Sequence, residues 1–423
     1  MKVLVVGGGG REHTILWKLA QSPMKPELFA APGNGGIAKL AKCVDIKATD
    51  VEGVIKFAKE NQIDLTVVAP DDPLMLGMVD RLEEEGLKAF GPRQNAAIIE
   101  GSKVFSKELM KKYGIPTAAY EVFDDSAKAI SYLEGVSYPT VVKAEGLALG
   151  KGVIIAANFE EAKAAVEEIM CDKVFGDAGS RVVIEEFLTG QEVSVLAFTD
   201  GKTLYPMVSA QDHKRAYDND EGLNTGGMGT FSPSRLYTEA IHNECMENIF
   251  MPTMKAMNQE GRTFKGVLYF GLIMTKNGVK VIEYNARFGD PETQVVLPRL
   301  KTDLLEIFLA VAEERLGDMT VEWADNAAVC VVMASGGYPK EYKKGLPISG
   351  LDVAEADEAI TVFHAGTKLD GETFLTNGGR VLGVTAVGND LEVAILKAYE
   401  GVKKIHFDNV HYRTDIGRKK ETI

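Results

Sequence analysis

The sequence has few cysteines, no long apolar run and a deficit of positive charge. Its four cysteines, Cys43, Cys171, Cys245 and Cys330, lie far apart, which excludes a dense disulfide framework and a Cys-x-x-Cys zinc site. There is no run of 18 apolar residues, and the N-terminal apolar stretch is too short for a signal peptide. The net charge of −14 argues against nucleic acid or an anionic membrane as a partner. These absences predict a cytoplasmic protein.

The remaining composition is that of a globular protein. In 423 residues, 45% are hydrophobic and 26% are charged, which allows two to four domains with ample cores. We find no internal repeat and no low-complexity linker. Changes in the expected pattern of strands and helices along the chain predict three domains, at residues 1–102, 103–322 and 323–423.

The N-terminal segment alternates strands with helical patterns. An apolar strand over residues 2–6 runs into four glycines and a helix over 12–21, and further strands are expected at 28–31, 65–69 and 88–90. This alternation predicts a parallel α/β domain that binds ligands at the carboxyl ends of its strands.

The glycine run does not fit a dinucleotide-binding motif. The third glycine of that motif falls on Glu12 or His13, depending on the register, and no acidic residue follows the second strand at the usual distance. A nicotinamide site is therefore disfavoured. A phosphate cradle formed by backbone amides at the start of the helix remains open.

The middle of the chain changes to mixed strands and helices. We expect helices at 102–113, 159–170 and 238–260, strands at 117–122, 138–143, 153–156 and 181–187, a strand–turn–strand unit at 191–208, and a polar loop at 211–233. After a helix over 303–316, strands at 327–334, 361–364 and 380–387 and a helix at 390–402 predict a small mixed C-terminal domain.

Residues 266–294 carry the most informative pattern. Two apolar runs joined at Asn277-Gly278 predict a β-hairpin. Alternation along its second strand places Glu283, Asn285 and Arg287 on one face, and Ile282 and Tyr284 on the other. Two oxygen ligands beside a guanidinium suit a hard cation that carries a polyphosphate. The alternative is a solvated polar face at a sheet edge.

A second candidate site follows an apolar strand that ends at Lys143. Residues 145–152, EGLALGKG, contain three glycines and Lys151, so backbone amides can approach an anion. This is not a Walker A loop, because it has Glu145 in place of glycine and Gly152 in place of serine or threonine. The alternative is a flexible turn.

Residues 182–188, VVIEEFL, predict a strand that leaves its sheet. The backbone of such a segment can pair with the edge of an adenine ring, and Glu192 can accept hydrogen bonds from ribose hydroxyls. Glu185 and Glu186 can instead be ordinary acids of an edge strand.

The order of these motifs resembles the ATP-grasp superfamily. The match extends to QDHKRAYDNDEGLNTGGMGTFSP at 211–233, VIEYNARFGDPETQ at 281–294 and HAGTKLDGETFLTNGGRVL at 364–382. Together with VLVVGGGGREH at 3–13, these motifs resemble the phosphoribosylamine–glycine ligase family, also called glycinamide ribonucleotide synthetases, from residue 1 to about 418. The implied fold is an N-terminal parallel α/β substrate domain, a central ATP-grasp domain with a mobile lid subdomain at about 120–190, and a small mixed C-terminal domain.

The resemblance implies an enzyme of purine biosynthesis. It would join glycine to 5-phosphoribosylamine through glycyl phosphate, releasing ADP and phosphate, with ATP as co-substrate and Mg²⁺ or Mn²⁺ as the ion. Its expected partners are these small molecules, and the expected state is a monomer or a weak dimer. The alternatives are another ATP-grasp carboxylate–amine ligase and a nucleotide-binding regulator without turnover.

The resemblance also implies residue roles. Nucleotide binding is expected of Lys103, Lys143, Gly146, Gly150, Lys151, Gly152, Glu185, Glu186, Phe187, Leu188 and Glu192. The metal is expected on Glu283 and Asn285, catalysis on Arg287, Asp212, His213 and Lys214, and substrate binding on Gly9, Gly10, Asp290 and Arg380. A solvated loop histidine is the alternative for His213. Many ATP-grasp enzymes carry a carboxylate at the position of Gly271, so a second tightly held ion is not expected here.

Overall fold

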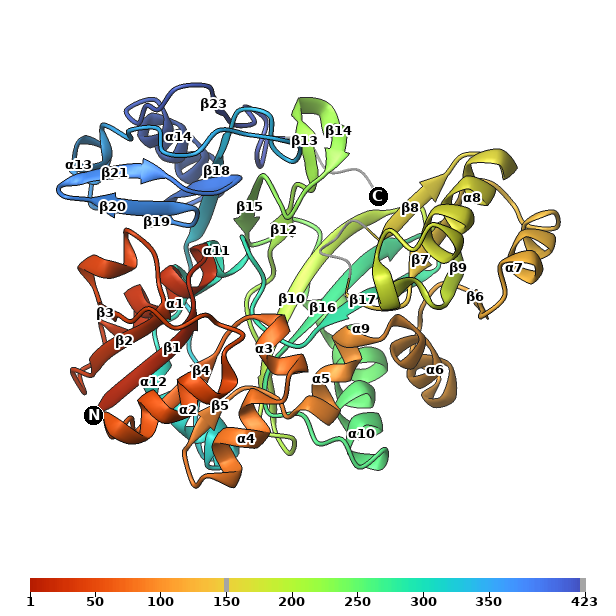
Figure 1. Cartoon of the computed structure of the whole chain (residues 1–423), viewed down its shortest axis with the longest axis horizontal. Helices are drawn as coiled ribbons and strands as arrows, with labels where there is room; N and C mark the ends of the chain where they lie inside the picture. The colour runs from red at the N-terminus through yellow and green to blue at the C-terminus, as the bar shows by residue number, and fades with distance from the viewer. Residues whose placement is uncertain (148–151, 419–423) are drawn as a thin grey trace.

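A computed structural model describes residues 1–147 and 152–418. The N-terminal and C-terminal units lie against each other, and the lid subdomain projects at the opposite end of the molecule (Figure 1). In the described parts of the chain, no helix has the length and the apolarity needed to span a bilayer.

The N-terminal unit is a parallel sheet with the strand order β3-β2-β1-β4-β5, which confirms the predicted α/β fold. Helix α1 begins at Gly10, two residues earlier than expected, because Glu12 Oε2 accepts a hydrogen bond from the Gly9 amide at 2.6 Å and caps the helix. The strands are β1 (Lys2–Gly7), β2 (Glu27–Pro32), β3 (Lys42–Cys43), β4 (Leu65–Val68) and β5 (Ala89–Phe90), and the helices are α1 (Gly10–Leu19), α2 (Val51–Glu60), α3 (Asp71–Met75), α4 (Met78–Glu84) and α5 (Gln94–Gly101).

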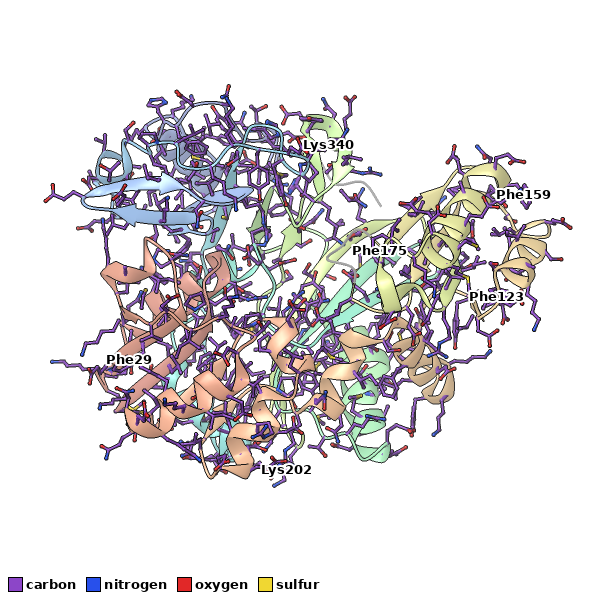
Figure 2. All side chains as sticks on the ribbon, in the orientation of Figure 1. Phe29, Phe123, Phe159, Phe175, Lys202 and Lys340 are labelled. Carbon is purple, nitrogen blue, oxygen red and sulfur yellow. The ribbon has the colours of Figure 1, made fainter. Side chains whose placement is uncertain are left out.

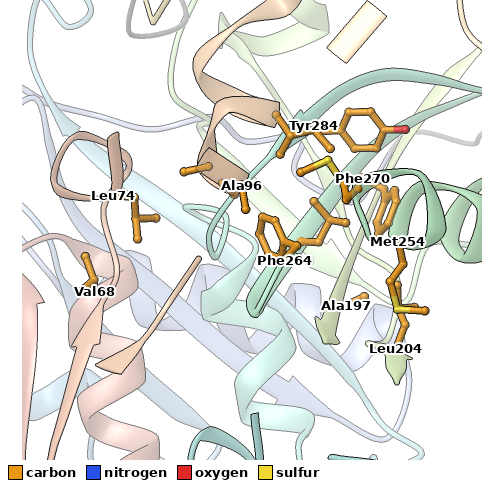
Figure 3. Close-up of a cluster of buried hydrophobic side chains, with 14 of the residues drawn as sticks. Val68, Leu74, Ala96, Ala197, Leu204, Met254, Phe264, Phe270 and Tyr284 are labelled. Carbon is orange, nitrogen blue, oxygen red and sulfur yellow. The ribbon is translucent and has the colours of Figure 1, made fainter. Parts of the chain in front are cut away.

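The centre of the molecule is an antiparallel sheet with the order β11-β10-β16-β17. Its last two strands form the hairpin predicted at Asn277-Gly278. Phe270 and Tyr284 lie in one buried cluster with Met254 of the helical segment that covers one face (Figure 3). The Phe250 ring of the same segment lies 4.4 Å from the Phe270 ring, centroid to centroid. The strands are β10 (Gln191–Thr199), β11 (Leu204–Pro206), β16 (Gly266–Thr275) and β17 (Gly278–Asn285). Helices α9 (Glu239–Cys245) and α10 (Met251–Gln259) are joined by a π-turn over Met246–Phe250. Helices α11 (Thr293–Val296) and α12 (Leu304–Ala312) lie further along the chain.

A β-bulge corrects the predicted alternation in β17. Gly271 pairs with Glu283 but Leu272 pairs with Val281, so Ile282 is the extra residue. Val281 and Tyr284 therefore both belong to the core, although they are three residues apart. The prediction that Ile282 shares a face with Tyr284 was wrong, because strict alternation does not allow for the inserted residue.

The lid subdomain is an antiparallel sheet with the order β6-β9-β7-β8 and its own core, against which Phe123, Phe159 and Phe175 pack (Figure 2). Its first strand begins three residues later than predicted, because Thr117 instead forms an isolated parallel bridge with Val281. The elements, with the helix that precedes them, are α6 (Lys103–Tyr113), β6 (Tyr120–Phe123), α7 (Ser126–Leu133), β7 (Thr140–Ala144), β8 (Val153–Ala156), α8 (Phe159–Val166) and β9 (Val182–Glu186).

The C-terminal unit contains an antiparallel sheet with the order β12-β15-β18-β22-β19, in which β12 is Gln211–Asp212 and β15 is Gly229–Ser232, and β23 pairs with β18. The strands are β18 (Ala327–Ser335), β19 (Ile360–His364), β22 (Arg380–Gly388) and β23 (Val410–His411), the separate hairpin is β20 (Thr367–Asp370) with β21 (Thr373–Thr376), and the helices are α13 (Leu351–Ala354) and α14 (Leu391–Val402).

The segment predicted as a polar loop at 211–233 is partly strand. It contains β12 (Gln211–Asp212), β13 (Arg215–Tyr217), β14 (Glu221–Asn224) and β15 (Gly229–Ser232). Phe231 is 2% exposed and packs in the core of the C-terminal unit. These strands are too short and too polar to show an alternating pattern. The second partner of β15, strand β18, lies about a hundred residues further along the chain.

The N-terminal and C-terminal units are joined by directed hydrogen bonds. The Asn34 side-chain amide donates to the Gly8 carbonyl at 2.9 Å and to the His364 carbonyl at 2.8 Å. The His13 Nδ1 atom accepts from the His364 amide at 2.7 Å. Both histidines are buried. The glycine loop of β1 is therefore fixed against the C-terminal sheet.

Candidate active site

The end of the hairpin is held by a buried carboxylate from α5. Glu100 accepts hydrogen bonds from the Asn285 side-chain amide at 3.1 Å and from the Ala286 backbone amide at 2.8 Å. It also lies 2.8 Å from the Arg287 guanidinium, which has Asp71 at 3.9 Å on another side. Since Glu100 takes the amide nitrogen of Asn285, the amide oxygen is left to face other groups. Sequence reasoning missed Glu100, because one acid in a helix gives no signal.

Charge compensation opposes the effect of burial on this group of residues. Burial alone would lower the pKa of the Arg287 guanidinium, but Glu100 and Asp71 outweigh burial and raise it. Burial raises the pKa of the Glu100 carboxyl, and Arg287 opposes that shift. Arg287 is thus a fixed cation beside Asn285.

Glu283 lies among lysines. Lys214 Nζ is 3.8 Å from Glu283 and 2.8 Å from Glu192. Burial would raise the pKa of the Glu283 carboxyl, but Lys214, Lys143 and Lys103 outweigh it and lower that pKa. Glu283 therefore carries a negative charge that can bind a cation, and the structure brings these predicted residues together.

The residues present fit a divalent cation with few protein ligands. Glu283 offers an ionised carboxylate, and Asn285 offers an amide oxygen oriented by Glu100. Within residues 1–147 and 152–418, no group of three histidine, cysteine, aspartate or glutamate side chains is placed to hold a metal. A Cβ atom on Gly271 would lie 3.0 Å from Glu283 Cγ, so the glycine gives the Glu283 side chain its space.

The lysines expected to bind phosphates lie at the base of the lid. Lys143 Nζ is 2.9 Å from Glu185 and 3.5 Å from the Ile282 carbonyl of β17. Lys103 Nζ donates to the Gly146 carbonyl at 2.9 Å, and burial lowers its pKa. Gly152 lies beside β7, where its carbonyl accepts from the Ala144 amide at 2.8 Å. The predicted contacts of Gly150 and Lys151 fall outside the described residues.

The expected adenine segment follows the end of β9. Glu186 is exposed, forms an ion pair with Lys280 at 2.9 Å and accepts from the Ala119 amide at 3.0 Å, as an edge acid would. Glu185 is 4% exposed and is not an ordinary edge acid. Phe187 is exposed and Leu188 is partly exposed beyond the last residue of the strand.

Residues 212 and 213 lie on β12 and just beyond it. Burial and the nearby Glu292 raise the pKa of the Asp212 carboxyl well above its usual range. The His213 ring is buried, with Nδ1 3.3 Å from the Gly229 carbonyl and Nε2 accepting from the Gly417 amide at 3.4 Å. The alternative of a solvated loop histidine was wrong, since both ring nitrogens face the backbone.

The expected substrate residues join three segments. Arg380 Nη1 donates to the Gly226 carbonyl at 2.6 Å and to the Asp290 carbonyl at 2.8 Å. The Asp290 carboxylate accepts from the Arg11 amide at 3.3 Å. The Gly9 amide, expected to bind a phosphate, instead donates to Glu12, so that part of the prediction is not supported by the geometry. Gly10 lies close to the Gln294 side chain, 2.7 Å from where its Cβ would be.

Three family models cover most of the chain. The N domain of phosphoribosylglycinamide synthetase matches residues 1–100, the ATP-grasp (A) domain of the same family matches 101–293, and its C domain matches 328–419. The chain belongs to the phosphoribosylglycinamide synthetase family. This confirms the resemblance and the expected ATP-grasp fold.

Named relatives of this synthetase family are similar over their full length. A phosphoribosylamine–glycine ligase of Halalkalibacterium halodurans is 51% identical over 419 residues, 99% of this chain and 97% of that protein. The ligase of Escherichia coli K12 is 49% identical over 421 residues, 99% of this chain and 98% of that protein.

Solved structures agree with the family. The crystal structure of a phosphoribosylamine–glycine ligase from Thermotoga maritima has a TM-score of 0.85 at 34% identity and covers 98% of this chain and 100% of that chain. A biotin carboxylase–nucleotide complex from Campylobacter jejuni has a TM-score of 0.76 at 13% identity, covering 97% and 92%. That likeness concerns the fold alone.

Proposed function

We propose that the chain joins glycine to 5-phosphoribosylamine, with ATP converted to ADP and phosphate and with glycyl phosphate as the intermediate. Family membership makes it an ATP-dependent ligase of purine biosynthesis. The observation that carries the proposal is the Glu100 carboxylate, which orients Asn285 and Arg287 next to Glu283. An ion-bound phosphate and a carboxylate substrate would meet at this point.

The chemistry explains why charge is concentrated here. A carboxylate is a poor acyl donor, so glycine is first phosphorylated, and the ribosylamine nitrogen then displaces phosphate. Such transfers depend mainly on positioning the reactants and on neutralising their oxygens. Positively charged side chains held in place beside a metal-ion site would position the reactants and neutralise their oxygens.

Each group of residues has its own task. Lys103 and Lys143 would bind nucleotide phosphates, and Glu283 with Asn285 would hold a divalent ion, Mg²⁺ with Mn²⁺ as the alternative. When bound, that ion supplies positive charge to phosphate oxygens. The Arg287 guanidinium would bind the acyl phosphate oxygens. Lys214 is paired with Glu192, and together with Asp212 it would exclude water from the site.

The ribosylamine would bind between the N-terminal and C-terminal units. Asp290 and Arg380 lie there beside Gly10. The backbone of residues 185–188 would hold the adenine, with Glu192 near the ribose. We further propose the domain division at residues 102 and 322, a cytoplasmic location and a monomeric state, the last of which size-exclusion chromatography with light scattering tests.

Release of ADP in a coupled assay, with each substrate omitted in turn, tests the reaction. We expect turnover that requires glycine, 5-phosphoribosylamine and ATP together. Activity with another acid or amine in place of these would indicate a different ligase, and ATP binding without turnover would indicate a regulator.

Isotope transfer tests the intermediate. Glycine labelled with heavy oxygen in its carboxylate should deliver one label to inorganic phosphate per turnover, while the other stays in the amide. Normal product with unlabelled phosphate would exclude glycyl phosphate and leave the ATP site intact.

A further inference from the structure

A buried carboxylate at the base of the lid is shared by two lysines. Lys107 on α6 places its Nζ 2.9 Å from Glu185 Oε2, and Lys143 on β7 places its Nζ 2.9 Å from Glu185 Oε1. The three side chains are between 2% and 7% exposed. One negative charge is thus paired with two positive charges, one from the lid and one from the helix that precedes it.

Lys107 is anchored more firmly than Lys143. Its Nζ also donates to the Thr117 hydroxyl at 2.8 Å, and that hydroxyl donates to the Val281 carbonyl at 2.8 Å. Thr117 and Val281 also form the bridge at which the lid begins. Burial lowers the pKa of Lys107 to about 8, although Glu185 opposes the shift. Keeping this ammonium charged in the interior is costly, and its contacts are with protein groups.

Lys143 faces a different situation. Its second contact is the Ile282 carbonyl at 3.5 Å, one residue before Glu283, so its ammonium lies between Glu185 and the metal and phosphate region. To bind a phosphate oxygen, Lys143 must weaken its pairing with Glu185. A buried carboxylate that loses its one cation is strongly destabilised, and a carboxylate that retains another cation is not.

We propose that Lys107 is a positioning residue that keeps Glu185 neutralised, so that Lys143 is free to bind nucleotide phosphates. The inference rests on the proposed function, because it assigns Lys143 to those phosphates. Lys107 remains with Glu185 and Thr117 while Lys143 changes partner. The role requires no contact between Lys107 and the nucleotide.

Binding of ATP and adenosine to Lys107→Met separates this role from a structural one. In the full chain, we expect the ATP dissociation constant to rise at least tenfold, because Lys143 is then held by Glu185. Adenosine, which has no phosphate, should bind within twofold of the wild type. Equal weakening of both ligands, or unchanged ATP affinity, would overturn the proposal.

A matched lysine on the same helix provides the control. Lys107 and Lys111 both lie over the Tyr120 ring, with Nζ at 5.7 and 5.5 Å from its centroid. Among the described residues, only Lys107 of the two is ion-paired with Glu185. Lys111→Met should therefore bind ATP within twofold of the wild type, and a loss equal to that of Lys107→Met would contradict the proposal.

A double variant tests the reason for the effect. Lys107→Met combined with Glu185→Gln removes the carboxylate that needs the cation, so ATP affinity should recover at least threefold over Lys107→Met alone. No recovery would overturn the proposal. If Lys107→Met does not fold, Lys107→Arg replaces it as the test of the role. Because arginine keeps the positive charge, this variant should bind ATP within about threefold of the wild type. A tenfold loss of ATP affinity would contradict the role.

Binding and turnover report on separate claims. Absence of ADP release by the wild type with all three substrates would defeat the proposed ligase function. Unchanged ATP affinity in Lys107→Met, beside normal wild-type turnover, would defeat the role of Lys107 alone.

Discussion

At the scale of single residues, the active site is a balance between carboxylates and cations that burial alone would not allow. Glu283 is kept ionised by Lys214, Lys143 and Lys103, and Arg287 by Glu100 and Asp71. The Glu283 side chain is more exposed than that of Arg287 and faces the proposed cation site, so removing its charge should affect turnover more than stability.

Glu283→Gln should lose at least a hundredfold in turnover and retain the fold. The substitution removes the one charged ligand from the proposed ion site, and a single electrostatic contact in such a site is worth roughly 10²–10³ in rate. Because the side chain is 37% exposed, the melting temperature without metal should move little. Steady-state kinetics across magnesium concentrations check this, and near-normal rates at saturating magnesium would disprove the metal assignment.

The sequence predicted the charged residues that lie on a recognisable strand or loop, and it missed those that support them from helices. Glu283, Asn285 and Arg287 stand out because they alternate after an apolar hairpin. Glu100 and Lys107 occupy ordinary positions of helical segments, and only the fold brings them to Asn285 and Glu185. No spacing rule connects residues that lie so far apart in the sequence.

At the scale of elements, the hairpin of β16 and β17 was predictable and its bulge was not. The turn at Asn277-Gly278 and two apolar runs define the hairpin locally. The bulge at Ile282 depends on the pairing between Gly271 and Glu283, which is set by packing across the sheet. Gly271, which stands at the bulge, leaves space for the Glu283 side chain.

Gly271→Ala should reduce turnover at least tenfold with little change in stability. A methyl group there would lie 3.0 Å from Glu283 Cγ and 3.4 Å from the Glu283 carbonyl oxygen, so the carboxylate must shift. A displacement of about 1 Å in a catalytic group can cost a hundredfold. Kinetics and thermal melting of the variant check this, with Gly135→Ala, where the nearest atom is 3.8 Å away, as the control. Equal activity of the two variants would contradict the account.

The short strand β15 was not predictable, because its reason for existing lies in another part of the chain. Gly229 pairs with Val331 and Ser232 pairs with Ala328. Its side-chain contribution to the core is Phe231. The local sequence, rich in glycine and polar residues, favours a loop.

Phe231→Ala should destabilise the chain by about 3–5 kcal/mol, the usual cost of removing a buried phenylalanine. Phe231 is 2% exposed and also packs against His213 and Arg235. Urea denaturation measures the loss. Tyr217→Ala, an aromatic of β13 that is 52% exposed, is the matched control and should change stability by less than about 1 kcal/mol. Similar losses in both variants would contradict the placement of β15 in the core.

At the scale of the whole molecule, buried neutral histidines make stability depend on pH. Burial lowers the pKa of His13 to about 3, and of His364 and His213 to about 4. In the unfolded chain a histidine titrates near 6.5. As pH falls from about 6.5 toward 4, the unfolded chain binds protons that the folded chain does not, so folding stability decreases over that window.

Each such histidine should contribute a slope of about 1.4 kcal/mol per pH unit between its two pKa values. His364→Gln should therefore reduce the pH dependence of the unfolding free energy between pH 6 and 4.5, measured by urea denaturation. His406→Gln, at an exposed position, is the control for the loss of one histidine. An unaltered slope in His364→Gln would show that this histidine is not held neutral.

The pairing of β15 with β18 also bears on how the chain can be made. Gly229 is synthesised about a hundred residues before its partner Val331, which at roughly 5–20 residues per second is a delay of about 5–20 seconds. During that time the rest of the ATP-grasp segment is synthesised, while the edge of β15 that will pair with β18 is still unpaired. A nascent chain stalled near residue 322 should therefore be the species most in need of a chaperone.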